Sequence, residues 1–159
     1  MLMPAISKKV ELEQLFAEHL YDKDMFLYNG YPHCNSIPDL TPKENLYKWV
    51  IVDKDKVIGF FTYFIDNYNN SVCSFGLYSF DRGNPILGFD VYKKMRELIK
   101  NYRRIEWRMI GGNPVQKYYD KLCNRYNGYR TMLHNVVRDE NGVYRDEYIY
   151  EIIKEKQNE

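Results

Sequence analysis

Cysteine, histidine and long apolar runs are all scarce in this sequence. The three cysteines, Cys34, Cys73 and Cys123, share no spacing typical of metal ligands, and an odd number of thiols cannot all pair within one chain. No apolar run approaches the roughly 18 residues of a membrane span, and residues 1–9 lack a signal-peptide pattern. These absences predict a reduced, soluble, cytoplasmic protein that holds no metal and does not contact membranes.

Net charge is also close to zero, at +1, but the charges are unevenly placed. Residues 91–130 hold 11 basic and 3 acidic side chains. Such a block suits a polyanionic ligand bound near this segment. A solvated helix face would give the same composition, so both interpretations stay open. The charges are too few and too local to indicate a nucleic-acid partner.

Apolar and aromatic residues are abundant by contrast. Hydrophobic side chains make up 45% of the 159 residues, enough for one well-packed domain, and 16 residues are tyrosine. Tyrosine suits half-buried clefts because its ring is apolar and its hydroxyl polar, although most of these residues are expected simply to fill strands. The sequence has no repeats, linkers or low-complexity tracts, so we expect a single domain over residues 1–159.

Residues Ser71–Tyr102 predict a strand, a loop and an amphipathic helix in succession. The segment 71–80 is rich in β-branched, aromatic and small apolar residues, as in a buried strand. In the loop over residues 81–88, Asn84 can cap the helix and Pro85 suits its first turn. A strand that feeds a helix in this way directs free N–H groups and the helix dipole at one spot, which forms a phosphate-sized anion site. A plain strand–turn–helix connection is the alternative.

The remaining segments predict an α/β (α+β) domain with a mixed, mainly antiparallel sheet. Because a crossover helix precedes it, the strand over residues 103–110 should run parallel to the strand over 71–80. The other patterns predict a helix over 8–20 capped by Ser7, a long ordered loop over 21–40, a short helix from the Thr41–Glu44 capping box, strands over 47–53, 57–66, 129–138 and 143–153, and a helix from Asn113 to Tyr126 that buries Val115, Tyr118, Leu122 and Tyr126.

This order of elements, with Val57-Ile58-Gly59-Phe60 in one strand and Asn113…Tyr119-Asp120-Lys121 after another, resembles the GNAT superfamily of acyl-CoA-dependent N-acetyltransferases. The resemblance covers nearly the whole chain. It implies a sheet of six to seven strands with helices on both faces. It also implies that strands 71–80 and 103–110 splay apart and hold the pantetheine arm of acetyl-CoA between them.

The same resemblance implies roles for individual residues. Asn113 is similar to an asparagine that contacts the cofactor, and Tyr119 to a tyrosine that protonates the leaving thiolate, against the alternative of a helix tyrosine packed on the sheet. The cofactor-binding set is the backbone of Tyr78, Ser79 and Phe80 for the pantetheine amides, and Arg82, Gly83, Asn84, Ile86 and Leu87 for the pyrophosphate.

The chain departs from the family pattern at two places. Its loop is one residue longer than the usual Gln/Arg-x-x-Gly-x-Gly/Ala, with Pro85 where a glycine is expected and with the bulkier Ile86 and Leu87 beside it. The spacing from Asn113 to Tyr119 is one residue shorter than usual. A catalytically inactive GNAT-like binding or regulatory module is therefore the alternative to an enzyme.

An active enzyme would transfer an acetyl group directly from acetyl-CoA to a primary amine. Glu106 is the candidate general base because its strand borders the expected cleft. It could equally pair with Arg108, which shares its face of the strand. Asp66 and Asp81 are less well placed.

The acceptor site is expected to be shaped by residues 21–40 and 131–150. The first of these stretches combines aromatic residues such as Phe26 and Tyr28 with acidic ones such as Asp22 and Asp24. Aromatic rings and carboxylates together suit a cationic amine, so we expect a small-molecule or peptide amine acceptor. A homodimer is compatible with the sequence.

Overall fold

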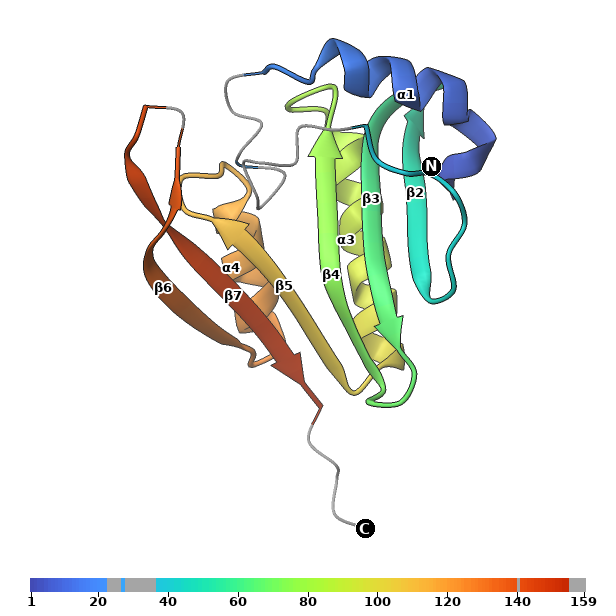
Figure 1. The fold of residues 1–159 in the computed structure, drawn as a ribbon. Coiled ribbons are helices and arrows are strands. Elements are labelled where there is room, and N and C mark those ends of the chain that lie inside the picture. The colour runs from blue at the N-terminus through green and yellow to red at the C-terminus, as the bar shows by residue number, and fades with distance from the viewer. Residues whose placement is uncertain (23–26, 28–36, 140, 155–159) are drawn as a thin grey trace.

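A computed structural model describes residues 1–22, 27, 37–139 and 141–154 (Figure 1). The elements run in the order β1 (Leu2–Pro4), the 3-10 helix η1 (Ala5–Lys8), α1 (Lys9–Glu18), β2 (Leu46–Asp53), β3 (Lys56–Asp66), β4 (Ser71–Ser79), α3 (Pro85–Asn101), β5 (Arg104–Ile110), α4 (Gln116–Arg125), β6 (Tyr129–Arg138) and β7 (Tyr144–Ile153).

The strands form one mixed sheet of seven, in the order β1-β2-β3-β4-β5-β7-β6. Every neighbouring pair is antiparallel except β4 and β5, which are parallel. The predicted fold class and the predicted parallel pair are therefore confirmed. The short edge strand β1 was not predicted, because three residues are too few to show a period of two.

Helices cover both faces of the sheet. In Figure 1, α3 and α4 lie on the same side, and their apolar residues share a core with every second residue of the strands. On the other face, Leu12 and Phe16 of α1 pack with Val50, Phe60 and Tyr78. Adjacent residues such as Val50 and Ile51 belong to opposite cores, as the alternation of strand side chains requires. No helix in the described part of the chain is both long and apolar enough to cross a bilayer.

Two predictions about helix starts are wrong. The capping box at residues 41–44 begins no helix. Instead Lys43 bridges to Leu46 around a turn in which Asn45 has φ +61°. The chain enters β2 at Leu46, where pairing with β3 takes the backbone groups that a helical turn would use. Ser7 does not cap α1, since it lies inside η1 and its hydroxyl donates to the carbonyl of Pro4 at 2.7 Å.

Candidate active site

Strands β4 and β5 separate after a very short shared stretch. Among the described residues they register only at Ser71 with Arg104 and at Val72 with Ile105. Beyond these pairs each strand keeps only its outer partner, because β4 stays paired with β3 as far as Ser79 and β5 with β7 along its whole length. The result is an open wedge between the two strands, which is visible in Figure 1.

A bulge in β4 lies where the wedge begins. Its pairing with β3 shifts register between Thr62 and Phe64, and Ser74 has φ +54°. A bulge inserts an unpaired residue and bends its strand. The bend therefore contributes to the divergence of β4 from β5.

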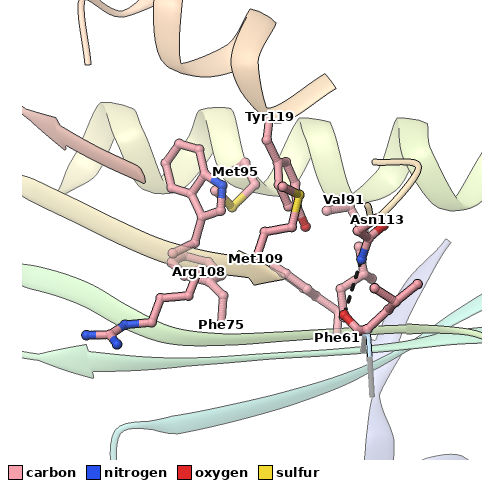
Figure 2. Close-up of a pocket in the computed structure, with 11 residues that line it drawn as sticks. Phe61, Phe75, Val91, Met95, Arg108, Met109, Asn113 and Tyr119 are labelled. Atoms are coloured by element: carbon pink, nitrogen blue, oxygen red, sulfur yellow. Dashed lines mark hydrogen bonds between the residues drawn. The ribbon is translucent and has the colours of Figure 1, made fainter. Parts of the chain in front are cut away.

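A cavity of about 50 Å³ lies in this region (Figure 2). Its walls are apolar side chains from β3, β4, β5 and α3, among them Phe61, Phe75, Met95 and Met109. Its polar lining residues are Arg108, Asn113 and Tyr119, together with the indole of Trp107. Its lining has the character of a small-molecule site, which is mostly apolar with a few polar groups, but the cavity is smaller than the roughly 300–1,000 Å³ of such sites.

Tyr119 comes from α4 and directs its hydroxyl toward the other lining residues in Figure 2. Its ring is half-buried and meets the rings of Trp107 and Tyr150 edge-on, at 5.9 Å between centroids in both cases. Burial raises the pKa of Tyr119 to about 12. The hydroxyl therefore keeps its proton at neutral pH, as a proton donor must.

The register of α4 brings Tyr119 inward. Its buried residues are Leu122 and Cys123, whereas Tyr118 is 60% exposed, so the prediction that Tyr118 is buried is wrong. The helix begins at Gln116, after a turn, rather than directly after Asn113. Tyr119, Leu122 and Cys123 follow the spacing of one helix face, which is the face that packs on the sheet.

Asn113 joins the end of β5 to a distant part of the chain. Its Oδ1 accepts from the N–H of Val115 at 3.0 Å and so closes the turn before α4. The prediction that Asn113 caps the helix is wrong, because Val115 is the N-cap and no side chain caps it. Its Nδ2 donates to the carbonyl of Leu27 at 3.2 Å. The side-chain amide thus makes bonds at both ends while it lines the cavity.

The start of α3 has the predicted cap, but few of its backbone N–H groups are available to a ligand. Asn84 Oδ1 accepts from the N–H of Ile86 at 3.0 Å, and Pro85 is the first helical residue. The N–H of Asn84 donates to Asp81, and Pro85 has none. A helix start leaves its first four N–H groups without helical partners. Among the described residues, only the N–H of Leu87 remains uncommitted in this group.

Some backbone N–H groups at the end of β4 also have hydrogen-bond partners already. The N–H groups of Phe80 and Asp81 both donate to the carbonyl of Ile58, at 2.9 and 3.3 Å. Tyr78 faces Phe60 in the same phase of the antiparallel ladder as the first of these bonds, so its backbone groups also point at β3, and among the predicted pantetheine contacts those of Ser79 face the wedge. The phenol ring of Tyr78 is buried on the α1 side of the sheet, away from Tyr119.

Carboxylates surround the predicted pyrophosphate loop. Asn84 Nδ2 lies 2.8 Å from a carboxylate oxygen of Asp81 and 3.4 Å from one of Asp53. Arg82, the loop's cation, lies 3.5 Å from the carboxylate of Asp22. Negative charge at a helix N-terminus stabilises the helix but competes with a bound anion. The local charge is therefore less favourable to a phosphate than the loop sequence predicts.

The bulky residue Leu87 has a structural explanation. A Cβ added to Gly59 of β3 would lie 2.5 Å from Leu87 Cδ1 and 2.9 Å from the carbonyl oxygen of Tyr78. Gly59 thus allows the side chain of Leu87 to pack against the sheet. The side chain of Leu87, in the first turn of α3, therefore packs inward on the core.

Glu106, the candidate general base, is held by two arginines of its own strand. It lies on the face of β5 opposite Trp107, accepts from Arg104 at 2.6 Å and lies 3.5 Å from Arg108. Arg108 also approaches Glu147 at 3.6 Å. Among the described residues Glu106 is not part of the cavity lining. These contacts support the alternative that Glu106 is an ion-pair partner.

A second, larger hollow of about 730 Å³ lies between α3, the end of α4 and the end of β7. It begins at Phe89, near the start of α3, and is lined by Lys93, Arg96 and Lys100 from the predicted basic block. No carboxylate of the described residues forms a salt bridge with any of the three. We call this hollow the basic groove. Its three cations, of which Arg96 is hydrogen-bonded to Tyr126, can attract an anion.

Sequence reasoning missed two parts of this site. The inward alternation of β5 indicated that Trp107 is buried but gave no sign of a role. Leu27 lines the cavity, and no pattern in the sequence marked it. Most of the stretch expected to shape the acceptor site, residues 23–26 and 28–36, lies outside the described residues.

Sequence comparison does not place the chain, because no protein-family model matches it and no curated protein matches its sequence. Comparison of the structure with solved structures does find similar proteins. An N-acetyltransferase from Staphylococcus aureus Mu50 superimposes with a TM-score of 0.68 at 16% identity, over 96% of this chain and 97% of that one.

Two further acetyltransferases show the same likeness. The ribosomal-protein-S18-alanine N-acetyltransferase from Escherichia coli matches with a TM-score of 0.68 at 13% identity, over 100% of this chain and 97% of its own. The microcin C7 self-immunity acetyltransferase, in complex with acetyl-CoA and AMP, matches with a TM-score of 0.65 at 18% identity, over 95% and 89%. The chain therefore has the fold of the GNAT N-acetyltransferases.

Proposed function

We propose that this protein is an acyl-CoA-dependent N-acyltransferase that moves an acetyl group from acetyl-CoA to a primary amine. The observation that carries the proposal is the wedge between β4 and β5, which opens at a cavity that Tyr119 lines. The fold supports it, since a structural neighbour was solved with acetyl-CoA bound.

Acetyl-CoA would supply the activated acyl group and a thiolate leaving group. In this proposal the free edge of β4 holds the pantetheine arm mainly through the backbone of Ser79, with Tyr78 and Phe80 on either side of it. The loop from Arg82 to Leu87, including Gly83, Asn84 and Ile86, holds the pyrophosphate mainly through the Leu87 N–H and the Arg82 guanidinium. The basic groove lies next along α3 and attracts the remaining phosphate.

Tyr119 is the proposed general acid. Its proton is retained at neutral pH, and its hydroxyl lies in the cavity where the thioester would end. Asn113 orients the loop that carries α4. The amine loses its proton to a carboxylate or to water. Glu106 is the carboxylate predicted from the sequence. Because Glu106 is held in ion pairs, we favour water as the base.

The proposed acceptor is a small-molecule or peptide amine. We propose that the protein acts in the cytoplasm and folds as a single domain.

A second candidate function is a GNAT-like binding or regulatory module without activity. The observation that favours it is the α3 start, where N–H groups are committed and Asp53, Asp81 and Asp22 lie close by.

The test is a thermal unfolding experiment with acetyl-CoA, CoA and ATP, followed by an assay of thiol release with a panel of amines. A ligand at a hundred times its dissociation constant adds about 2.7 kcal/mol to the free energy of unfolding. We expect acetyl-CoA and CoA to stabilise the protein more than ATP does. No stabilisation at millimolar acetyl-CoA would contradict the proposal, and binding without turnover of any amine would favour the inactive module.

A further inference from the structure

We infer that the indole N–H of Trp107 is a ligand donor in the β4–β5 cavity, where it binds a carbonyl oxygen of the pantetheine arm. The inference rests on the proposed function and adds a residue to it. Trp107 lines the cavity and is 2% exposed, and its Nε1 is buried without a hydrogen-bond partner among the described residues.

A buried indole N–H without a partner calls for an explanation. Buried tryptophans usually find an acceptor, because the N–H loses its water on folding and gains nothing in return if it is left alone. Because Trp107 is one of the residues that line the cavity, a ligand bound there can supply the missing oxygen.

The packing around Trp107 holds its ring in place. The ring stacks on Tyr150 at 5.2 Å and 5° between planes, and Tyr119 meets it edge-on at 5.9 Å. The hydroxyl of Tyr150 donates to Asp120 at 2.9 Å, and Arg130 donates to the same carboxylate oxygen. These contacts fix the second ring of the stack as well, so the donor is preorganised.

The chain has only one other tryptophan, and its setting differs. Trp49 also lacks a hydrogen bond by strict geometry, but its N–H faces the hydroxyl of Tyr63. Burial raises the pKa of Tyr63 to about 12, and the N–H of Trp49 works against that rise. Trp49 is not part of the cavity lining, and Lys94 lies 5.3 Å above its ring. Trp49 is therefore a matched control.

The cavity indicates the chemistry of the ligand. Phe75, Met95 and Met109 line it, so the part of the ligand inside must be largely apolar. The amide of Asn113 is already bonded at both ends. An apolar chain that carries isolated carbonyl groups fits such a wall, and the pantetheine arm has amide carbonyls and, when acylated, a thioester carbonyl.

The experiment is calorimetric titration of the Trp107→Phe variant with acetyl-CoA, CoA and 3′-phospho-ADP, which is the nucleotide without the arm. We expect roughly 5- to 100-fold weaker binding of the ligands that carry the arm, since a bound oxygen loses its donor. Binding of 3′-phospho-ADP should not change. Equal losses for acetyl-CoA and CoA would assign the bond to an amide, and a loss confined to acetyl-CoA would assign it to the thioester.

The Trp49→Phe variant should bind acetyl-CoA like the wild type. It also leaves Trp107 as the only indole, so its fluorescence should change when acetyl-CoA or CoA is added and stay constant with 3′-phospho-ADP. Benzothienylalanine at position 107 replaces the N–H by sulfur and keeps the two-ring shape. It should reproduce the affinity loss of Trp107→Phe without its change in volume.

Two results would overturn the inference while leaving the proposed function intact. One is wild-type affinity for acetyl-CoA and CoA with benzothienylalanine at position 107. The other is an equal loss of affinity for all three ligands in a folded Trp107→Phe protein, because that pattern indicates a general distortion. Failure of the wild type itself to bind acetyl-CoA would instead count against the proposed function.

Discussion

At the scale of single residues, Tyr119 separates binding from chemistry. If its hydroxyl protonates the departing thiolate, that contact forms fully only in the transition state. Tyr119→Phe should therefore lower kcat by roughly 10- to 1000-fold and leave the affinity for acetyl-CoA nearly unchanged. Steady-state kinetics and calorimetry check this. An unchanged kcat would make Tyr119 a packing residue, and a large loss of affinity would make its hydroxyl a cofactor anchor.

The raised pKa of Tyr119 adds a pH dependence to the same test. With a pKa of about 12, the hydroxyl stays protonated through neutral and mildly alkaline pH. The wild-type rate should therefore show no loss from this group below about pH 10, more than one unit under that pKa. Any alkaline decline below that point should persist in Tyr119→Phe.

Glu106 allows a second residue-scale test. Its contacts with Arg104 and Arg108 make it an ion-pair partner, and half-exposed pairs contribute only about 0–1 kcal/mol to stability. We expect Glu106→Gln to keep the acid limb of the pH–rate profile and to change kcat by less than about threefold, well short of the loss expected for a general base. Loss of the acid limb would restore Glu106 as the base. Arg104→Lys serves as a control for disturbance of the ion pairs.

At the scale of elements, the contact between α3 and β3 depends on Gly59. The Cβ of Gly59→Ala would meet Leu87 Cδ1 at 2.5 Å and the carbonyl oxygen of Tyr78 at 2.9 Å. One of these must shift, so we expect a loss of about 1–3 kcal/mol in the free energy of unfolding. Because the shift moves the α3 start, acetyl-CoA affinity should fall as well. Denaturant unfolding and calorimetry measure the two effects.

Gly88 provides the matched control within α3. A Cβ there meets nothing within 4 Å, and the position is helical. Gly88→Ala should therefore raise stability by about 0.4–1 kcal/mol. Equal stability of Gly59→Ala and the wild type would show that α3 does not need its close approach to β3.

At the scale of the whole molecule, the charge of the basic groove should govern long-range attraction. If Lys93, Arg96 and Lys100 attract the donor's phosphates, acetyl-CoA affinity should fall severalfold between about 0.05 and about 0.5 M salt. Replacing all three by alanine should flatten that dependence. Replacing Lys43, which pairs with Asp39 and is not part of the groove, should not. Salt-insensitive binding by the wild type would leave the groove as ordinary solvated surface.

Local sequence signals determined much of this protein. The strands that form the β2–β3 and β6–β7 hairpins, the Asn84 cap and Pro85 at the start of α3 were all predicted correctly. Each depends on residues that are neighbours in the chain, such as a turn flanked by alternating apolar residues. The order of these elements was enough to predict the parallel pair, since a crossover helix leaves little choice of direction.

Only the tertiary structure decided how these parts meet. The capping box at residues 41–44 failed because pairing between β2 and β3 outweighs a local helix signal. Tyr118 was judged by periodicity, but the packing of α4 set its surroundings. For Glu106 the sequence left a base and an ion-pair partner open, and only the structure shows its contacts with Arg104 and Arg108. The N–H groups of Phe80 and Asp81 donate to Ile58, about twenty residues earlier in the chain, and the N–H of Trp107 finds no acceptor among the described residues packed around it. A pattern along the chain cannot contain such contacts, because they exist only once distant segments pack together.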